Sequence, residues 1–140
     1  MQPEKAILKT EKDSTTPLGT EWNNLEKTTR QAKYSLNYSK IMLGLCLLKM
    51  EAMQEDYKIQ REYGTIFHSL AHLHLNYRRA KKLIDNARFV LEMNIKEEHY
   101  PLLDSAILEM CRQKKVNPET ILSEINTLAY SDLLKTIEGV

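Results

Sequence analysis

The sequence predicts an all-α fold: a compact bundle of about five helices, with one long N-terminal helix and a helix-turn-helix-like pair. Apolar residues recur at steps of three and four over most of the chain, which is the period of a helix face. No segment alternates apolar and polar residues for long enough to indicate a strand. The 4 glycines and 4 prolines are also too few for the turns of a many-stranded fold.

Length and composition indicate one globular domain after a short arm. The chain of 140 residues can bury a sizeable core, and its 42% hydrophobic and 28% charged residues are ordinary for a globular protein. Residues 1–19 are polar, mixed in charge and closed by Pro17 and Gly19, so we expect a flexible N-terminal arm. Residues 20–140 are expected to form a single helical domain.

Several features favour a cytoplasmic protein. Charges interrupt the first residues, so no export signal is expected, and the longest apolar stretch, residues 41–48, is too short to cross a bilayer. Cys46 and Cys111 lie in apolar runs without a CxxC spacing, and we interpret them as small buried hydrophobes in a reducing compartment. A disulfide between them is the less favoured alternative.

The longest expected helix begins near Thr20, a suitable cap, and carries an apolar stripe from about Trp22 to about Met53. A loop or helix break is expected near Asp56. The stripe covers about nine helical turns, more than a short domain needs to bury by itself, so we expect a homodimer or a higher oligomer. The predicted dimer interface is Trp22, Leu25, Ala32, Leu36 and Leu43, with Thr29 and Ser39 at the remaining steps and Leu47 and Met50 at the far end.

Four shorter helices are expected to follow. The second covers about residues 62–73, and the third covers 77 to about 93 with Asn76 as its cap. Pro101 is expected in the first turn of the fourth helix, and Asn117 caps the fifth. The residues expected to face the core are, helix by helix, Tyr63, Ile66, Phe67, Leu70 and Leu73; Ala80, Leu83, Ile84, Ala87, Val90 and Leu91; Leu102, Leu103, Ala106, Ile107 and Met110; Ile121, Leu122, Ile125 and Leu128; and, after a break at Ser131, Leu133, Leu134 and Ile137.

Three histidines fall within seven residues and raise the question of a metal site. His68 and His72 are four residues apart and therefore share a helix face, while His74 lies near the helix end. However, residues 67–82 contain no Asp, Glu or Cys, and no HExxH motif is present. We interpret His68 and His72 as amphipathic side chains that border the apolar face, and no metal is predicted.

The second and third helices are joined at the short segment 73–76, which is the layout of a helix-turn-helix. In such a pair the first turns of the second helix enter the major groove of DNA. Asn76, Tyr77 and Arg78 are then candidates for contacts with base edges. The candidates for phosphate contacts are Arg79, Lys81, Lys82 and Arg88. The alternative is that this basic face is simply solvated.

The same helix pair is similar to a single tetratricopeptide unit, through the spacing of Gly64, Phe67, Ala71, Ala80, Ile84 and Ala87. Tetratricopeptide units bind peptides in arrays, and for this chain the resemblance implies only a packed helical hairpin. His68 stands where the tetratricopeptide pattern has glycine, and a shift of about 34 residues brings Lys114 and Pro118 to positions that require alanine and an apolar residue. An array of such repeats is therefore not expected.

No catalytic motif is apparent. The sequence has no GxSxG, no glycine-rich phosphate loop and no paired ExxH motifs, and His99 is interpreted as an ordinary exposed loop residue. We expect a protein that is not an enzyme and needs no cofactor.

The favoured interpretation is a small DNA-binding protein, a regulator or accessory factor, for example of a mobile element. Because the net charge is only +1, this interpretation depends on local charge. The alternative is a helical adaptor or assembly subunit that binds a protein partner. No membrane partner is predicted.

Overall fold

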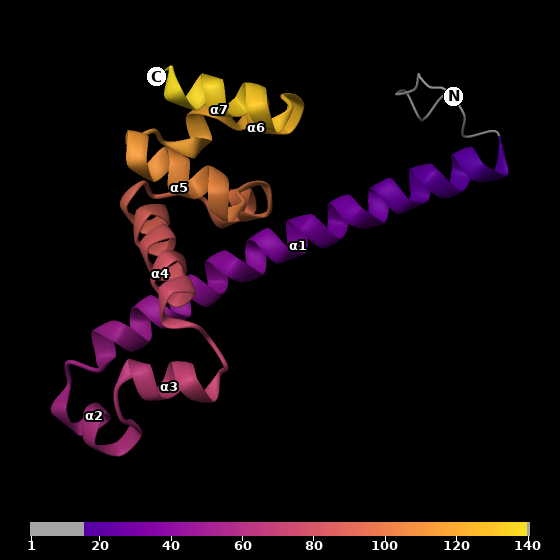
Figure 1. Ribbon diagram of the computed structural model, residues 1–140. Coiled ribbons are helices and arrows are strands. Elements are labelled where there is room, and N and C mark those ends of the chain that lie inside the picture. Colours follow the sequence, from indigo (N-terminus) through magenta and orange to yellow (C-terminus); the bar gives the residue numbers. More distant parts are fainter. Residues whose placement is uncertain (1–15, 140) are drawn as a thin grey trace. The chain divides into compact units, whose positions relative to one another are not determined.

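The computed structural model describes residues 16–139, and this part of the chain consists of helices and their connecting loops, without a strand (Figure 1). The predicted all-α fold with a long N-terminal helix is confirmed. Seven α-helices and two 3-10 helices occur within the described residues, rather than about five. In chain order they are α1 (Pro17–Met53), α2 (Tyr57–Tyr63), α3 (Ile66–His72), α4 (Tyr77–Glu92), η2 (Glu97–Leu102), α5 (Ser105–Lys114), η3 (Pro118–Ile121), α6 (Leu122–Thr127) and α7 (Tyr130–Glu138).

Contacts between residues divide the chain within α1 into two units, Met1–Ser35 and Leu36–Val140. In the first unit the described residues form the N-terminal half of α1. This helix begins at Pro17, three residues earlier than predicted, because the Thr16 hydroxyl accepts a hydrogen bond from the Gly19 N–H at 2.9 Å. Most of the predicted flexible arm, residues 1–15, lies outside the described residues.

In the second unit, α4 packs against the C-terminal part of α1 at a very short distance. A Cβ atom added to Gly44 would collide with the Leu83 carbonyl oxygen and would lie 3.1 Å from the Ala87 Cβ atom. Gly44 and Ala87 are both buried, so small residues on each helix allow the two backbones to approach.

Two apolar clusters fill the interior of the second unit. The smaller one, here the hairpin core, joins α1, α3 and α4 and consists of Leu47, Ile66, Leu70, Ala80, Leu83 and Ile84. The larger one, here the C-terminal core, joins α1 and the end of α4 to η2, α5, η3 and α7. Its buried residues are Ile41, Phe89, Val90, Ile95, Tyr100, Leu103, Ile107, Leu108, Cys111, Val116, Ile121, Leu133 and Ile137.

The predicted second helix is wrong in its extent. Residues 57–72 form two short helices, separated at Gly64, whose φ of 82° interrupts the helix. The predicted break near Asp56 is confirmed, since the Asp56 carboxylate accepts a hydrogen bond from the Lys58 N–H at 2.8 Å and caps α2. Of the five predicted core residues, Ile66 and Leu70 are buried. The other three are exposed: Tyr63, Phe67 and Leu73.

Helix α4 agrees closely with its prediction, and α5 does not. Asn76 caps α4 as expected, and the predicted inner face is buried apart from Leu91, which is 57% exposed. Pro101 lies inside η2, and α5 begins only at Ser105 because the Asp104 carboxylate accepts from the Ile107 N–H at 2.8 Å.

The C-terminal elements and the cysteines require further corrections. The Asn117 cap is confirmed, but the turn that it starts is the 3-10 helix η3, and α7 begins at Tyr130 rather than after a break at Ser131. Two predicted core residues are exposed, Ala106 and Leu128. Cys111 is buried, and this burial raises the pKa of its thiol to about 11. Cys46 is exposed instead, and both thiols are free.

His99 is half-buried and bonded, not an isolated loop histidine. Its Nδ1 lies 2.6 Å from Oε2 of Glu119, which also accepts the Lys96 backbone N–H at 2.9 Å. These two hydrogen bonds, first that from Lys96 and then that from His99, lower the pKa of the Glu119 carboxyl. Glu119 therefore ties the start of η3 to the start of η2.

We predict that Gly44→Ala destabilises the protein by about 2 kcal/mol or more, because the added methyl group forces α1 and α4 apart. The direction of the change in unfolding free energy is informative, because alanine in place of glycine inside a helix ordinarily stabilises by about 1 kcal/mol. Urea unfolding followed by circular dichroism measures the change, with the exposed Ser35→Ala as a control in the same helix. A Gly44→Ala protein as stable as the wild type would refute the close crossing.

We predict that Glu119→Gln reduces the acid sensitivity of stability. Because the folded state lowers the Glu119 pKa below its ordinary value of 4.5, its carboxylate stabilises the fold above that pH. This contribution disappears as pH falls through the folded pKa. Urea unfolding between pH 6 and about pH 3 measures how much unfolding free energy is lost on acidification. This loss should be smaller for Glu119→Gln than for the exposed Glu138→Gln control. Equal slopes would contradict the role of Glu119.

Candidate nucleic-acid interface

The joint between α3 and α4 is a tight turn made without glycine. His74 adopts the left-handed conformation, with φ of 57°. The Leu75 N–H donates to the Leu70 carbonyl at 2.9 Å, and the His74 N–H donates to the Ala71 carbonyl at 3.2 Å. These two bonds form a Schellman motif, which ends α3, and α4 begins after the short joint 73–76. The predicted helix pair with a short joint is therefore present.

The first turn of α4 is held by its cap and by a ring contact. The Asn76 side-chain oxygen accepts from the Arg79 N–H at 3.2 Å, so this oxygen is engaged in the fold itself. The Tyr77 ring lies 4.9 Å from the Phe67 ring, centroid to centroid. Phe67 is thus on the outside of the pair, where it packs on the first residue of α4.

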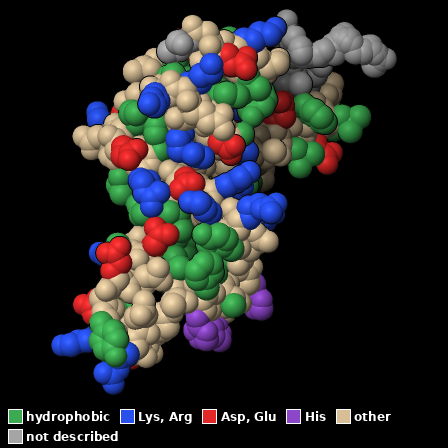
Figure 2. Space-filling view, turned by 60° about the vertical axis from the view of Figure 1, so that its left-hand side comes forward, with side chains coloured by type: hydrophobic (Ala, Val, Ile, Leu, Met, Phe, Trp, Pro, Cys, Tyr) green, Lys and Arg blue, Asp and Glu red, His purple; other side chains and the backbone are tan. Residues whose placement is uncertain are grey.

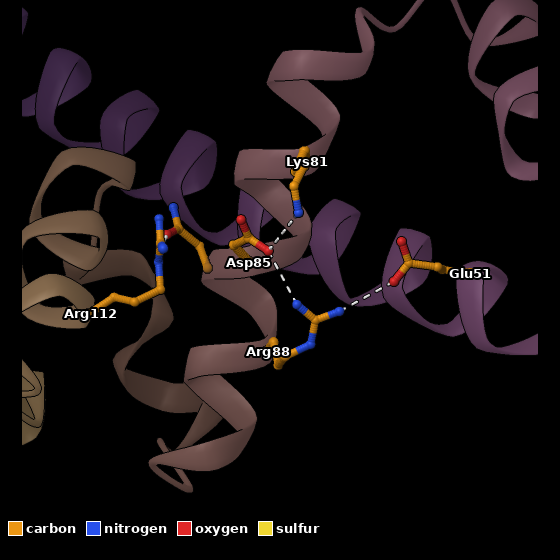
Figure 3. Close-up of polar contacts among 6 residues, drawn as sticks. Glu51, Lys81, Asp85, Arg88 and Arg112 are labelled. Atoms are coloured by element: carbon orange, nitrogen blue, oxygen red, sulfur yellow. Dashed lines mark hydrogen bonds and ion pairs between the residues drawn. The ribbon is translucent and has the colours of Figure 1, made fainter.

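Three of the five basic residues predicted on α4 form ion pairs with acids. Asp85 lies 3.7 Å from Lys81 and 3.1 Å from Arg88, and Arg88 also reaches Glu51 of α1 at 3.2 Å (Figure 3). Lys82 lies 3.9 Å from Glu109 of α5. The positive charge of this face is therefore partly compensated, and Figure 2 shows basic and acidic side chains next to one another on the visible face.

Arg78 and Arg79 differ from these three ion-paired residues. Both are exposed, and neither forms an ion pair with another residue in the described range 16–139. Arg79 lines a groove of about 580 Å³, which sequence reasoning missed because its walls come from helices distant in the chain. The groove is bounded by Leu36, Ser39, Lys40, Leu43, Leu75, Arg79, Lys82, Leu83, Asn86, Ser105 and Glu109.

Two buried asparagines anchor the elements around this groove. The Asn37 amide donates to the Pro101 carbonyl at 2.7 Å, which fixes η2 on α1. The Asn86 amide donates to the Ser105 carbonyl at 3.4 Å, and its oxygen accepts from Arg112 at 3.3 Å. Each asparagine joins elements across the core, and Asn86 uses both its amide nitrogen and its oxygen. Neither is distinguishable by sequence from a surface asparagine.

The residues predicted at a dimer interface fall into both units. In the first unit Trp22 is 56% and Leu25 54% exposed, and Ala32 is exposed as well. In the second unit Leu36 is 47% exposed and Leu43 is half-buried, and both line the groove. Farther along the stripe, Leu47 is buried in the hairpin core.

The histidine pair is compact and lies on the surface. His68 and His72 are both exposed, and their Nε2 atoms are 3.1 Å apart. Within residues 16–139 no group of three His, Cys, Asp or Glu residues is placed to hold a metal ion. The pair could supply two ligands, one or two fewer than a protein zinc site provides.

No family model, curated protein or solved structure matches this chain. In the part of the chain that the structure describes, no helix has both the length and the apolar character needed to cross a membrane.

We predict that chelator treatment leaves the melting temperature unchanged, because residues 16–139 place no third metal ligand beside His68 and His72. Elemental analysis of the purified protein should find no stoichiometric zinc. About one zinc per chain, lost in the His68→Ala, His72→Ala variant, would contradict this expectation.

Proposed function

We propose that the protein is not an enzyme and binds duplex DNA with the first turns of α4. The observation that carries this proposal is the short joint 73–76, which leads from α3 into a capped helix whose exposed first turns carry the basic residues. A helix-turn-helix presents its second helix after a short joint of this kind. The residues at the start of α4, from Asn76 to Arg79, are all exposed.

The geometry indicates which of the seven candidate residues would contact base edges and which would contact phosphates. Arg78 and Arg79 both have no acidic partner within the described residues, but Arg79 lines the groove, so Arg78 is the better candidate for a base edge. Asn76 and Tyr77 also face the groove of DNA, with the Asn76 oxygen already used in the cap. The remaining candidates suit phosphate contacts: Arg79, Lys81, Lys82 and Arg88.

The ion pairs set a limit on affinity for arbitrary DNA. Lys81, Lys82 and Arg88 must exchange carboxylate partners for phosphates, so the gain from each phosphate contact is smaller than for an unpaired cation. The affinity for a target duplex whose bases Arg78 contacts would then exceed the weak, salt-sensitive affinity for random duplex. Such a difference in affinity is what a regulator or accessory factor with a defined target site needs.

A second candidate is a helical adaptor that binds a protein. The exposed apolar residues Trp22 and Leu25, together with the groove that begins at Leu36, favour this alternative. It makes the opposite forecast for DNA: only the weak electrostatic background, and loss of the protein partner when the charges of α4 are reversed.

We predict that Arg78→Ala reduces the preference for a selected target duplex over random duplex, by about 1–3 kcal/mol if Arg78 pairs with a guanine edge. Target duplexes are first selected from a random pool, and fluorescence anisotropy then measures both affinities at several salt concentrations. Lys81→Ala should instead weaken binding to all duplexes and reduce the salt slope by roughly one unit. Lys135→Ala, an exposed lysine on α7, is the control and should change neither.

Asp85→Asn provides a test in the opposite direction. It removes the carboxylate that pairs with Lys81 and Arg88, so Lys81 becomes available to phosphates and Arg88 keeps only its pair with Glu51. Duplex affinity should therefore rise. A folded protein in which neither Asp85→Asn nor the combined alanine variant of Arg78, Arg79, Lys81 and Lys82 changes duplex affinity would end the DNA proposal.

A further inference from the structure

The N-terminal half of α1 presents large apolar side chains to solvent. Leu18 is 79% exposed, and Trp22, the only tryptophan of the chain, is 56% exposed. Leu25 lies on the same stripe, at the three- and four-residue steps of a helix face. In proteins most of the stability of a helix comes from packing of its apolar face rather than from helix propensity. The exposed stripe is therefore a candidate surface for a partner.

The second unit offers a groove of matching character. Its apolar wall is made by Leu36 and Leu43 of α1 with Leu75 and Leu83, and its volume is about 580 Å³. The small side chain of Ser39 lies between the two α1 leucines in sequence. The rim is mainly basic, with Lys40, Arg79 and Lys82 against the one acid Glu109.

The sequence of α1 has a register that pairs these two surfaces between copies. Positions 18, 22, 25, 29, 32, 36, 39 and 43 alternate steps of four and three, which is a heptad seam. When the seam is matched with a reversed copy of itself, Leu18 faces Leu43, Trp22 faces Ser39, and Leu25 faces Leu36. At the centre Thr29 faces Ala32. The largest side chain thus meets a small one, as interdigitated packing requires.

We infer that two copies of the chain associate through antiparallel α1 helices, with the Leu18–Leu25 stripe of each copy seated in the groove of the other. The groove shares Arg79 and Lys82 with the DNA proposal, whereas Arg78 and Lys81 do not line it, so the association of two copies can be tested without DNA.

The charges beside the seam select the antiparallel direction. In an antiparallel pair, Glu26 of one helix lies beside Lys33 of the other, twice by symmetry. A parallel pair in register would instead place Glu21 beside Glu26 and oppose like charges. Residues 18–26 also carry two acids and no base, which complements the basic rim of the groove.

Cysteine cross-linking tests the register directly. In a Cys46→Ser background, Leu25→Cys and Leu36→Cys are made as separate proteins and then mixed under mild oxidation. Both positions are exposed, so circular dichroism should confirm that each variant folds. A disulfide needs Cα atoms within about 7 Å. The antiparallel register leaves identical positions about 16 Å apart along the helix, by its rise of about 1.5 Å per residue. The expected result is a cross-linked dimer in the mixture and none in either protein alone.

Charge exchange gives a second readout that leaves the seam intact. Glu26→Lys and Lys33→Glu should each weaken the dimer about tenfold in sedimentation equilibrium, because each places like charges together at two sites. Mixing the two variants one to one restores both attractions, so the mixture should associate like the wild type, as should the double variant. If the two helices paired in another register, Glu26 and Lys33 would not face each other, and mixing the two variants would not restore association.

Three results would overturn the inference. Cross-links within each single cysteine variant would show a parallel pair. A wild-type protein that sediments only as monomer at micromolar concentration would exclude a second copy as the occupant, leaving a different protein as the one that covers the groove. Equal weakening in the mixed charge variants would refute the Glu26–Lys33 pairing. None of these measurements uses DNA, so a failure here leaves the DNA proposal standing, and the reverse is also true.

Discussion

The close crossing of α1 and α4 at Gly44 is the contact on which the second unit depends. Only a glycine leaves room for the Leu83 carbonyl at that point, and Ala87 is the smallest side chain that still contributes apolar surface there. The hairpin core and the C-terminal core both use residues from each helix. A shift of α4 away from α1 would open both clusters at once, so the packing of the second unit depends on this crossing.

The same crossing determines which side of α4 meets solvent. Its inner face of small and branched residues is used up against α1 and α5, so Arg78, Lys81 and Arg88 remain on the outside. Glu51 then lies within reach of Arg88, and Glu109 of α5 lies within reach of Lys82. The packing that presents the basic face therefore also supplies the acids that moderate it. A helix with this arrangement suits selective binding better than strong attraction to any polyanion.

Local signals were sufficient for much of the fold. The cap at Asn76 and the helical spacing of the α4 core predicted that helix nearly to the residue, because both act within one or two turns. The start of α5 could not be obtained in this way. Pro101 and Asp104 are both acceptable start signals, and the choice between them depends on η2, which Asn37 of α1 holds in place from 64 residues away.

The sequence predicted that the basic residues of α4 are exposed, but it did not predict which acids lie beside them. The basic residues of α4 are exposed as the sequence indicated, but their partners Glu51 and Glu109 come from other helices. The exposed stripe at Trp22 was recognisable from its period, whereas the groove required the folded positions of α1, α4 and α5. The left-handed turn at His74 had no glycine to signal it, and only the bonds of the Schellman motif show it.

Changes in backbone NMR signals on addition of a selected target duplex test whether α4 binds DNA. If it does, the amide signals that move belong to the joint 73–76 and to the first turns of α4, through Lys82, with smaller changes at Arg88. Shifts confined to α5–α7, or no shifts at protein concentrations well above the measured dissociation constant, would contradict the assignment of α4 as the DNA-binding helix.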